Sequence, residues 1–129
     1  MRRQGRIQDA AAIYRQILQG QPTHFQALYD YGMLCLQAGQ PDAALQCIGQ
    51  ALQVNPQFAD GWCARGVAFL QLQRREDAIT CFDRALALNP DFIEALANRA
   101  TALLELNRLR EALDGFDKVL AIKPDHANS

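Results

Sequence analysis

Prolines recur at equal intervals along the chain. The series is Pro22, Pro56, Pro90 and Pro124, with 34 residues between successive members, and only Pro41 stands outside it. Each proline of the series lies in a similar phrase, GQPTH, VNPQF, LNPDF and IKPDH, and the intervening segments align without a gap. A repeat of fixed length indicates copies of one supersecondary unit, each burying its apolar face against its neighbours. The sequence therefore predicts a stack of units instead of a single closed core.

Each unit carries two helical patterns of apolar and small residues. In its first half such residues recur at spacings of four and three, as at Trp62, Gly66 and Phe69. The second half repeats the pattern, as at Ala78 and Phe82. These spacings place the residues on one side of a helix. We therefore expect an all-α chain in which every unit is a pair of amphipathic helices.

Residues suited to helix ends mark the unit boundaries. Gly39 and Asn107 suit the left-handed residue that ends a helix, whereas Gln73 at the equivalent position suits it less well. Pro41 fits the first turn of the next helix, and the repeating prolines stop the second helix of each unit. We expect one solenoid domain with a partial unit at 1–24 (second helix only), full units at 25–58, 59–92 and 93–126, and a tail at 127–129.

Small residues recur where the two helices of a unit would cross. They are Gly32, Gly66 and Ala100 in the first helices and Ala44, Ala78 and Ala112 in the second helices. Side chains of this size let paired helices approach to about 8–10 Å. A large residue at these positions is expected to push the pair apart.

Composition argues against several classes of partner. The 13 Lys plus Arg are balanced by 14 Asp plus Glu, for a formal net charge of −1. Such a chain has no overall attraction to nucleic acid or to anionic membranes. No apolar run approaches the roughly 18 residues of a membrane span, and the N-terminus does not resemble a signal peptide. We expect a cytoplasmic protein with neither a nucleic-acid nor a membrane partner.

The sequence contains no pattern typical of an active site. The cysteines, Cys35, Cys47, Cys63 and Cys81, form no CxxC pair and fit neither a zinc site nor a disulfide framework, so we expect reduced thiols. The two histidines occupy equivalent turns between units. No clustered nucleophile and base or phosphate-binding loop is present. We therefore expect no enzymatic activity, no catalytic residue, no metal site and no cofactor.

The repeat resembles the tetratricopeptide family. The family signature, W-x₂-L-G-x₂-Y followed by A-x₃-F and P, is matched by Trp62, Gly66, Phe69, Ala78, Phe82 and Pro90. The resemblance covers essentially the whole chain and implies a right-handed superhelical α-solenoid of antiparallel helix pairs, with about three and a half repeats. The repeats are also similar to bacterial arrays, including those attached to O-GlcNAc-transferase-like proteins.

One position departs from the family pattern. Where the family favours Leu, this chain has Tyr31, Arg65 and Arg99. An arginine can pack its aliphatic stem while its guanidinium group reaches water, so we expect the substitution to be tolerated.

The resemblance also implies where a ligand binds. Members of the family hold a protein or peptide segment on the concave surface, which the first helix of each unit lines. The groove positions fall on Tyr29, Asp30, Met33, Leu36, Asp60, Cys63, Val67, Leu70, Glu94, Asn98 and Thr101. This set contains apolar and acidic residues but no Lys or Arg. We expect a protein-interaction scaffold for an apolar or basic segment, with the alternative that some of the apolar residues pack against the neighbouring helix.

Two ligand types of the family are not expected here. Chaperone-binding members grip a terminal carboxylate with Lys, Arg and Asn, but the corresponding positions here include Tyr29, Ala64 and Glu94, so an acidic EEVD-like tail is not the expected ligand. The transferase-linked arrays hold the peptide backbone with a row of asparagines, of which only Asn98 is present. The groove position of Cys63 predicts that it is the accessible thiol.

Two other functions remain as alternatives. The first is self-association into a homo-oligomer, because the helix faces at both ends lack a partner and no polar capping helix follows Pro124. The apolar residues concerned are Ala10, Tyr14 and Ile17 at one end and Leu113, Phe116 and Leu120 at the other. The second is a role as the regulatory or substrate-presenting arm of a larger enzyme, such as a glycosyltransferase.

Overall fold

The computed structural model describes residues 2–21 and 23–122. These residues form helices α1 (Arg2–Gly20), α2 (Phe25–Gln37), α3 (Pro41–Val54), α4 (Ala59–Gln71), α5 (Arg75–Leu88), α6 (Ile93–Glu105) and α7 (Leu109–Ile122), with no strand in the described part of the chain. The all-α prediction is therefore confirmed. The predictions for Pro22, for Pro124 and for residues 123–129, including the tail at 127–129, lie outside the described residues.

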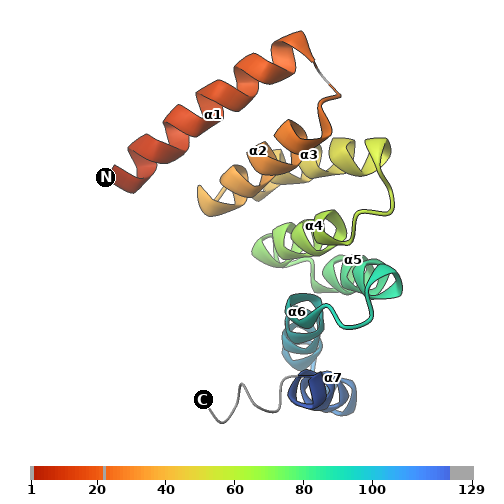
Figure 1. Ribbon diagram of the computed structural model, residues 1–129. Coiled ribbons are helices and arrows are strands. Elements are labelled where there is room, and N and C mark those ends of the chain that lie inside the picture. Colours follow the sequence, from red (N-terminus) through yellow and green to blue (C-terminus); the bar gives the residue numbers. More distant parts are fainter. Residues whose placement is uncertain (1, 22, 123–129) are drawn as a thin grey trace.

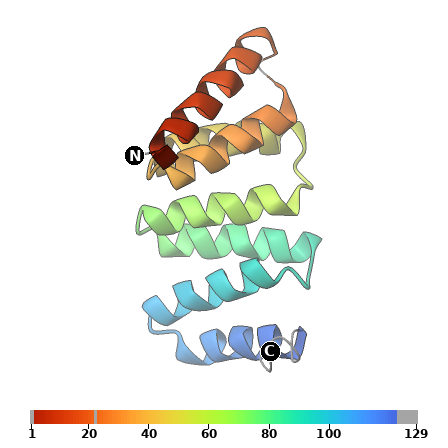
Figure 2. The ribbon, with the colours of Figure 1, turned by 60° about the vertical axis from the view of Figure 1, so that its left-hand side comes forward.

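The helices stack as antiparallel pairs in one direction. The pairs are α2 with α3, α4 with α5 and α6 with α7, while α1 packs against α2. Their first helices begin at Phe25, Ala59 and Ile93, at intervals of 34 residues. Figure 1 shows the pairs following one another from the N-terminus to the C-terminus, and Figure 2 shows the same order after a rotation of 60°. First helices of adjacent pairs also touch, α2 with α4 and α4 with α6, which aligns them along one side of the stack.

A left-handed residue closes the turn within each pair. Gly39, Gln73 and Asn107 have φ angles of 73°, 65° and 64°. In the first of these turns the Gln40 N–H donates to the Cys35 carbonyl at 2.8 Å, and the same bond recurs in the other two turns. This is the hydrogen bonding of a Schellman motif. Gln73 is the less suited residue type. It adopts the same conformation because its turn has the same backbone hydrogen bonds as the turns at Gly39 and Asn107.

Glycines let the two helices of a pair approach closely. A Cβ atom added to Gly32 would lie 2.5 Å from Ile48 Cγ1, and one added to Gly66 would lie 2.5 Å from Phe82 Cε1. Ile48 and Phe82 are fully buried, so neither can move aside without disturbing the core. In these two pairs the missing side chain of the glycine thus leaves the space that Ile48 or Phe82 fills.

We predict that Gly66→Ala lowers the free energy of unfolding by about 1–3 kcal/mol, because the methyl group would overlap the ring of Phe82. Urea denaturation followed by circular dichroism measures the change. The matched control is Gly49→Ala, where an added Cβ meets nothing within 4 Å and should be neutral or stabilise by up to about 1 kcal/mol through helix propensity. Equal stability of Gly66→Ala and the parent chain would contradict the packing argument.

Candidate functional site

A groove runs along the first helices of the stacked pairs. It has a volume of about 460 Å³ and is lined by Tyr29, Met33, Leu36, Gln37, Asp60, Ala64, Val67, Gln71, Phe92 and Glu94. The lining of α4 shows why these residues come together. Asp60, Ala64, Val67 and Gln71 recur at spacings of four and three, so they form one face of that helix. Because α2, α4 and α6 touch in succession, such faces adjoin to form one surface.

The structure places about half of the predicted groove residues in this lining. Those that line it are Tyr29, Met33, Leu36, Asp60, Val67 and Glu94. Those that do not are Asp30, Cys63, Leu70, Asn98 and Thr101. Phe92, which the sequence analysis did not select, also lines the groove. The sequence feature that could have identified Phe92 is the repeated phrase NPQF and NPDF. It places Phe58 and Phe92 at equivalent positions just before a first helix.

Two of the residues outside the lining pack between helices. Leu70 contacts the apolar clusters of both the second and the third pair, so it contributes to the interface between pairs. Asn98 lies beside the Cys63 thiol and is half-buried. The side chains of Leu70 and Asn98 therefore contact neighbouring helices of the stack.

Two more of these five residues, Thr101 and Asp30, are held by local hydrogen bonds. The exposed Thr101 hydroxyl donates to the Ala97 carbonyl at 3.0 Å within α6. Asp30 accepts a hydrogen bond from the Gln26 amide at 2.9 Å and a longer one from the Tyr14 hydroxyl at 3.5 Å. Asp30 thus connects α1 to α2 instead of lining the groove.

The prediction that Cys63 is the accessible thiol is wrong. Its exposed fraction is 2%, because it lies in the cluster that contains Ala95 of the next pair. Burial is the main cause that raises the pKa of Cys63 to about 12, followed by the negative charges of Glu94 and Asp60. All the cysteines are free thiols, and Cys47 is the least buried of them.

Negative charge gathers around the groove. Tyr29 packs edge-on against Phe58, with ring centroids 4.8 Å apart. Burial raises the pKa of Tyr29 to about 12, and the charges of Asp60, Glu94 and Asp30 add to this effect. The lining contains no Lys or Arg to balance these carboxylates. The local potential therefore favours a cationic group over an anionic one.

The arrangement suits non-covalent binding. Its lining combines apolar side chains with the carboxylates of Asp60 and Glu94. Within residues 2–21 and 23–122, no group of at least three His, Cys, Asp or Glu side chains is placed to hold a metal ion. Over the same residues, no helix is long and apolar enough to span a bilayer.

Models of one repeat family match the chain along most of its length. A tetratricopeptide repeat model matches residues 1–66, and two further models with the same description match residues 59–92 and 81–114. No curated protein matches the chain.

Several solved structures have a similar fold. The crystal structure of MamA superposes with a TM-score of 0.89 at 22% identity, covering 95% of this chain and 72% of that one. MamA 41-end from Desulfovibrio magneticus RS-1 gives 0.89 at 23% identity, covering 95% and 70%. The first TPR of Spaghetti (RPAP3), bound to the HSP90 peptide SRMEEVD, gives 0.76 at 25% identity, covering 78% and 79%. The MamA structures therefore share the fold of this chain.

We predict that iodoacetamide modifies Cys47 before Cys63 in the folded protein. Both pKa values are raised, to about 11 for Cys47 and about 12 for Cys63, but only Cys47 is partly exposed. The higher pKa makes the reactive thiolate of Cys63 the scarcer of the two at about pH 8. Peptide mapping by mass spectrometry measures the order, with urea-unfolded protein as the control. Modification of Cys63 as fast as Cys47 in the folded state would contradict the burial of Cys63.

Proposed function

Because this chain belongs to the tetratricopeptide repeat family and is a scaffold for protein–protein interactions, we propose that its groove binds a protein segment with apolar anchors and a net positive charge. The observation that carries this proposal is the lining itself. It combines apolar and aromatic side chains with Asp60 and Glu94, and it contains no Lys or Arg. The same chemistry would serve an extended or a helical segment.

Affinity in such a groove comes from a few apolar anchors. Tyr29, Met33, Val67 and Phe92 line the groove and are each only half-buried in the free chain, so a ligand can cover their remaining surface. Desolvated anchors of this kind supply most of the binding energy at interfaces. Exposed charges such as Asp60 mainly set the association rate and the choice of partner. Leu70 is not among the anchors, because it already packs between pairs.

An acidic segment fits this groove poorly. The peptide in the Spaghetti structure, SRMEEVD, carries adjacent glutamates and a terminal aspartate. Here such a segment would meet Asp60 and Glu94 with no Lys or Arg in the lining to pair with it. Like charges at close range cost several kcal/mol. The proposed ligand therefore differs in charge from that peptide.

The proposed role is binding alone, without a catalytic step by this chain. A chain that holds a segment can also present it to a catalytic domain, as an arm of an O-GlcNAc-transferase-like protein would. The free thiols support a reducing, cytoplasmic location.

We predict that Asp60→Lys slows the association of a fluorescent peptide of alternating Leu and Arg several-fold at low salt, with a smaller effect at high salt. Met33→Ala should weaken binding by about 1–2 kcal/mol through loss of an anchor. Stopped-flow anisotropy measures the rates and titration the affinities.

The control for the charge reversal is Asp117→Lys, at an exposed position on α7 that does not line the groove. If Asp117→Lys slowed association while Asp60→Lys did not, the ligand would have to sit elsewhere and the groove assignment would be wrong.

The exposed face of α7 favours a second function, which is pairing with another copy of this chain. The exposed fraction of Leu113 is 62%, whereas Ile79, its equivalent 34 residues earlier, is 7% exposed because α6 covers it. Leu120 is 55% exposed, whereas Leu52, two units earlier, is 6% exposed. The α7 surface thus presents to solvent the positions that inner pairs bury. We propose that α7 of a second copy covers them in a two-fold arrangement.

The residues predicted for the opposite end are less exposed than Leu113 and Leu120, although Ile13 of α1 is 58% exposed. Ile17 is 36% exposed, whereas Ala10 and Tyr14 are half-buried, and Tyr14 contacts Asp30 of α2. At the α7 end, Phe116 is also half-buried, against the cluster of the last pair. Leu113 and Leu120 are thus the most exposed of the residues predicted for self-association, and the proposed contact centres on them.

We predict that light scattering across a concentration series detects a weak dimer of the parent chain and that Leu113→Glu shifts it to monomer. The glutamate would place a charge at the centre of the apolar contact. The control is Leu88→Glu, at a 41% exposed position near the end of α5 that lies outside the α7 face. A monomeric parent at high concentration would rule out self-association.

A further inference from the structure

A second pocket lies between α3 and α4. It has a volume of about 370 Å³ and is lined by Gln46, Gly49, Gln50, Leu52, Gln53, Trp62 and Arg65. None of these residues lines the groove. At about 100° per residue, Trp62 and Arg65 lie roughly 140–200° around α4 from Asp60. The pocket is therefore a separate surface on the other face of the same helix.

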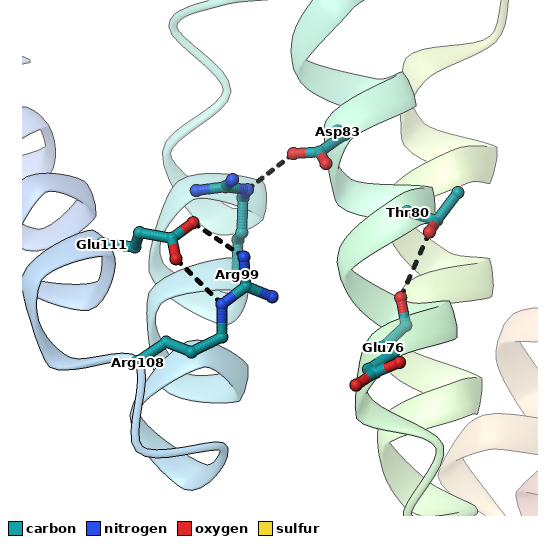
Figure 3. Close-up of polar contacts among 6 residues, drawn as sticks. All are labelled: Glu76, Thr80, Asp83, Arg99, Arg108 and Glu111. Carbon is teal, nitrogen blue, oxygen red and sulfur yellow. Dashed lines mark hydrogen bonds and ion pairs between the residues drawn. The ribbon is translucent and has the colours of Figure 1, made fainter.

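Arg99 occupies the same position in its unit as Arg65, and its charge is paired with that of Asp83. The two residues are 34 positions apart. The Arg99 Nε–H donates to Asp83 Oδ1 at 2.6 Å, which joins α6 to α5 of the preceding pair. Figure 3 shows the guanidinium group and the carboxylate facing one another across the two helices.

The corresponding carboxylate is absent one unit earlier. The residue 34 positions before Asp83 is Gly49 on α3, which lines the second pocket. A Cβ atom added to Gly49 meets nothing within 4 Å, so the space for a side chain is open. Arg65 forms no ion pair with any residue in the described part of the chain. The position beside Arg65 that corresponds to Asp83 thus carries no side chain and belongs to the second pocket.

The structure holds the Arg65 guanidinium group in position. It lies 5.6 Å from the ring centroid of Trp62 and 5.2 Å from that of Phe69, and its Nη1 donates to Cys81 Sγ at 3.8 Å. Its head thus lies against two aromatic rings. Sulfur is a weak acceptor, so most of the five N–H donors of Arg65 stay available. An arginine fixed in this way loses little conformational freedom when it binds a carboxylate.

A second cation adds to the positive charge. The Arg84 guanidinium group also lies over Trp62, 5.4 Å from the ring centroid. Arg84 forms no ion pair with the residues that the structure describes. Positive charge therefore lies in the pocket lining at Arg65 and beside the pocket at Arg84, in contrast to the groove, whose carboxylates include Asp60 and Glu94.

We propose that this pocket binds an Asp or Glu side chain from an acidic segment of a partner protein. Arg65 donates paired N–H bonds to the carboxylate, as Arg–carboxylate pairs commonly do. The amides of Gln46, Gln50 and Gln53 can donate to and accept from the backbone of the same segment without adding charge. This second site does not rest on the groove proposal, and the two surfaces take segments of opposite charge.

Trp62 provides a direct readout, because it is the single tryptophan of the chain and lines the pocket. The probe is a peptide of alternating Leu and Glu, titrated while Trp62 fluorescence is recorded. The matched control peptide has Gln in place of each Glu. We expect a saturable change with the Glu peptide and none with the Gln peptide.

Two pairs of variants test the role of charge. Gly49→Asp supplies the missing carboxylate within the chain and should lower affinity for the Glu peptide about tenfold or more, as should Arg65→Gln. Gly49→Ala adds a methyl group without charge and should lower affinity much less than Gly49→Asp does. Arg99→Gln, at an arginine that Asp83 already holds, should also bind like the parent. Circular dichroism establishes that each variant is folded.

Three results would overturn the proposal. One is equal binding of the Glu and Gln peptides. Another is a loss of affinity in Gly49→Ala as large as in Gly49→Asp. The third is stronger binding of a single-stranded oligonucleotide than of the Glu peptide, which would assign the pocket to phosphates. Unchanged Glu-peptide binding by Asp60→Lys would support a site separate from the groove, so either proposal can fail without the other.

Discussion

The contact between a glycine on one helix and a large side chain on its partner determines how the first two pairs are built. Gly66 leaves room for the Phe82 ring, and Gly32 does the same for Ile48. With these side chains fully buried, the helices of a pair lie close together, and the first helices of successive pairs can touch. The groove depends on this contact between first helices, because its lining is shared between α2, α4 and the start of α6.

The sequence predicted the fold well because the fold is local and repetitive. The 34-residue spacing, the helical stripes and the end signals at Gly39 and Asn107 all act within one unit, and the helices begin and end accordingly. The site was predicted less well because it depends on the rotation between units, which spacing does not encode. Cys63 turned out to face the next pair and Leu70 to pack between pairs, although both occupy family groove positions. The empty place at Gly49 became evident only once the ion pair one unit later was known.

A net charge of −1 conceals a chain whose charges are separated in space. On α4, Asp60 belongs to the groove and Arg65 to the pocket on the opposite face. Composition reports only the sum of these charges, so it disfavours a general attraction to polyanions but says nothing about two surfaces of opposite sign. Residues of α4 line both the groove and the pocket, and one helix can therefore serve two chemistries.

Contacts among the described helices extend no further than the adjacent pair. The first and the last pair make no direct contact among the described residues. Only the interfaces between successive pairs therefore resist bending of the stack. A small rotation at each interface changes the curvature of the whole. A segment that fits the groove only after such a rotation must bend the stack, so its length and stiffness become selection criteria alongside its side chains.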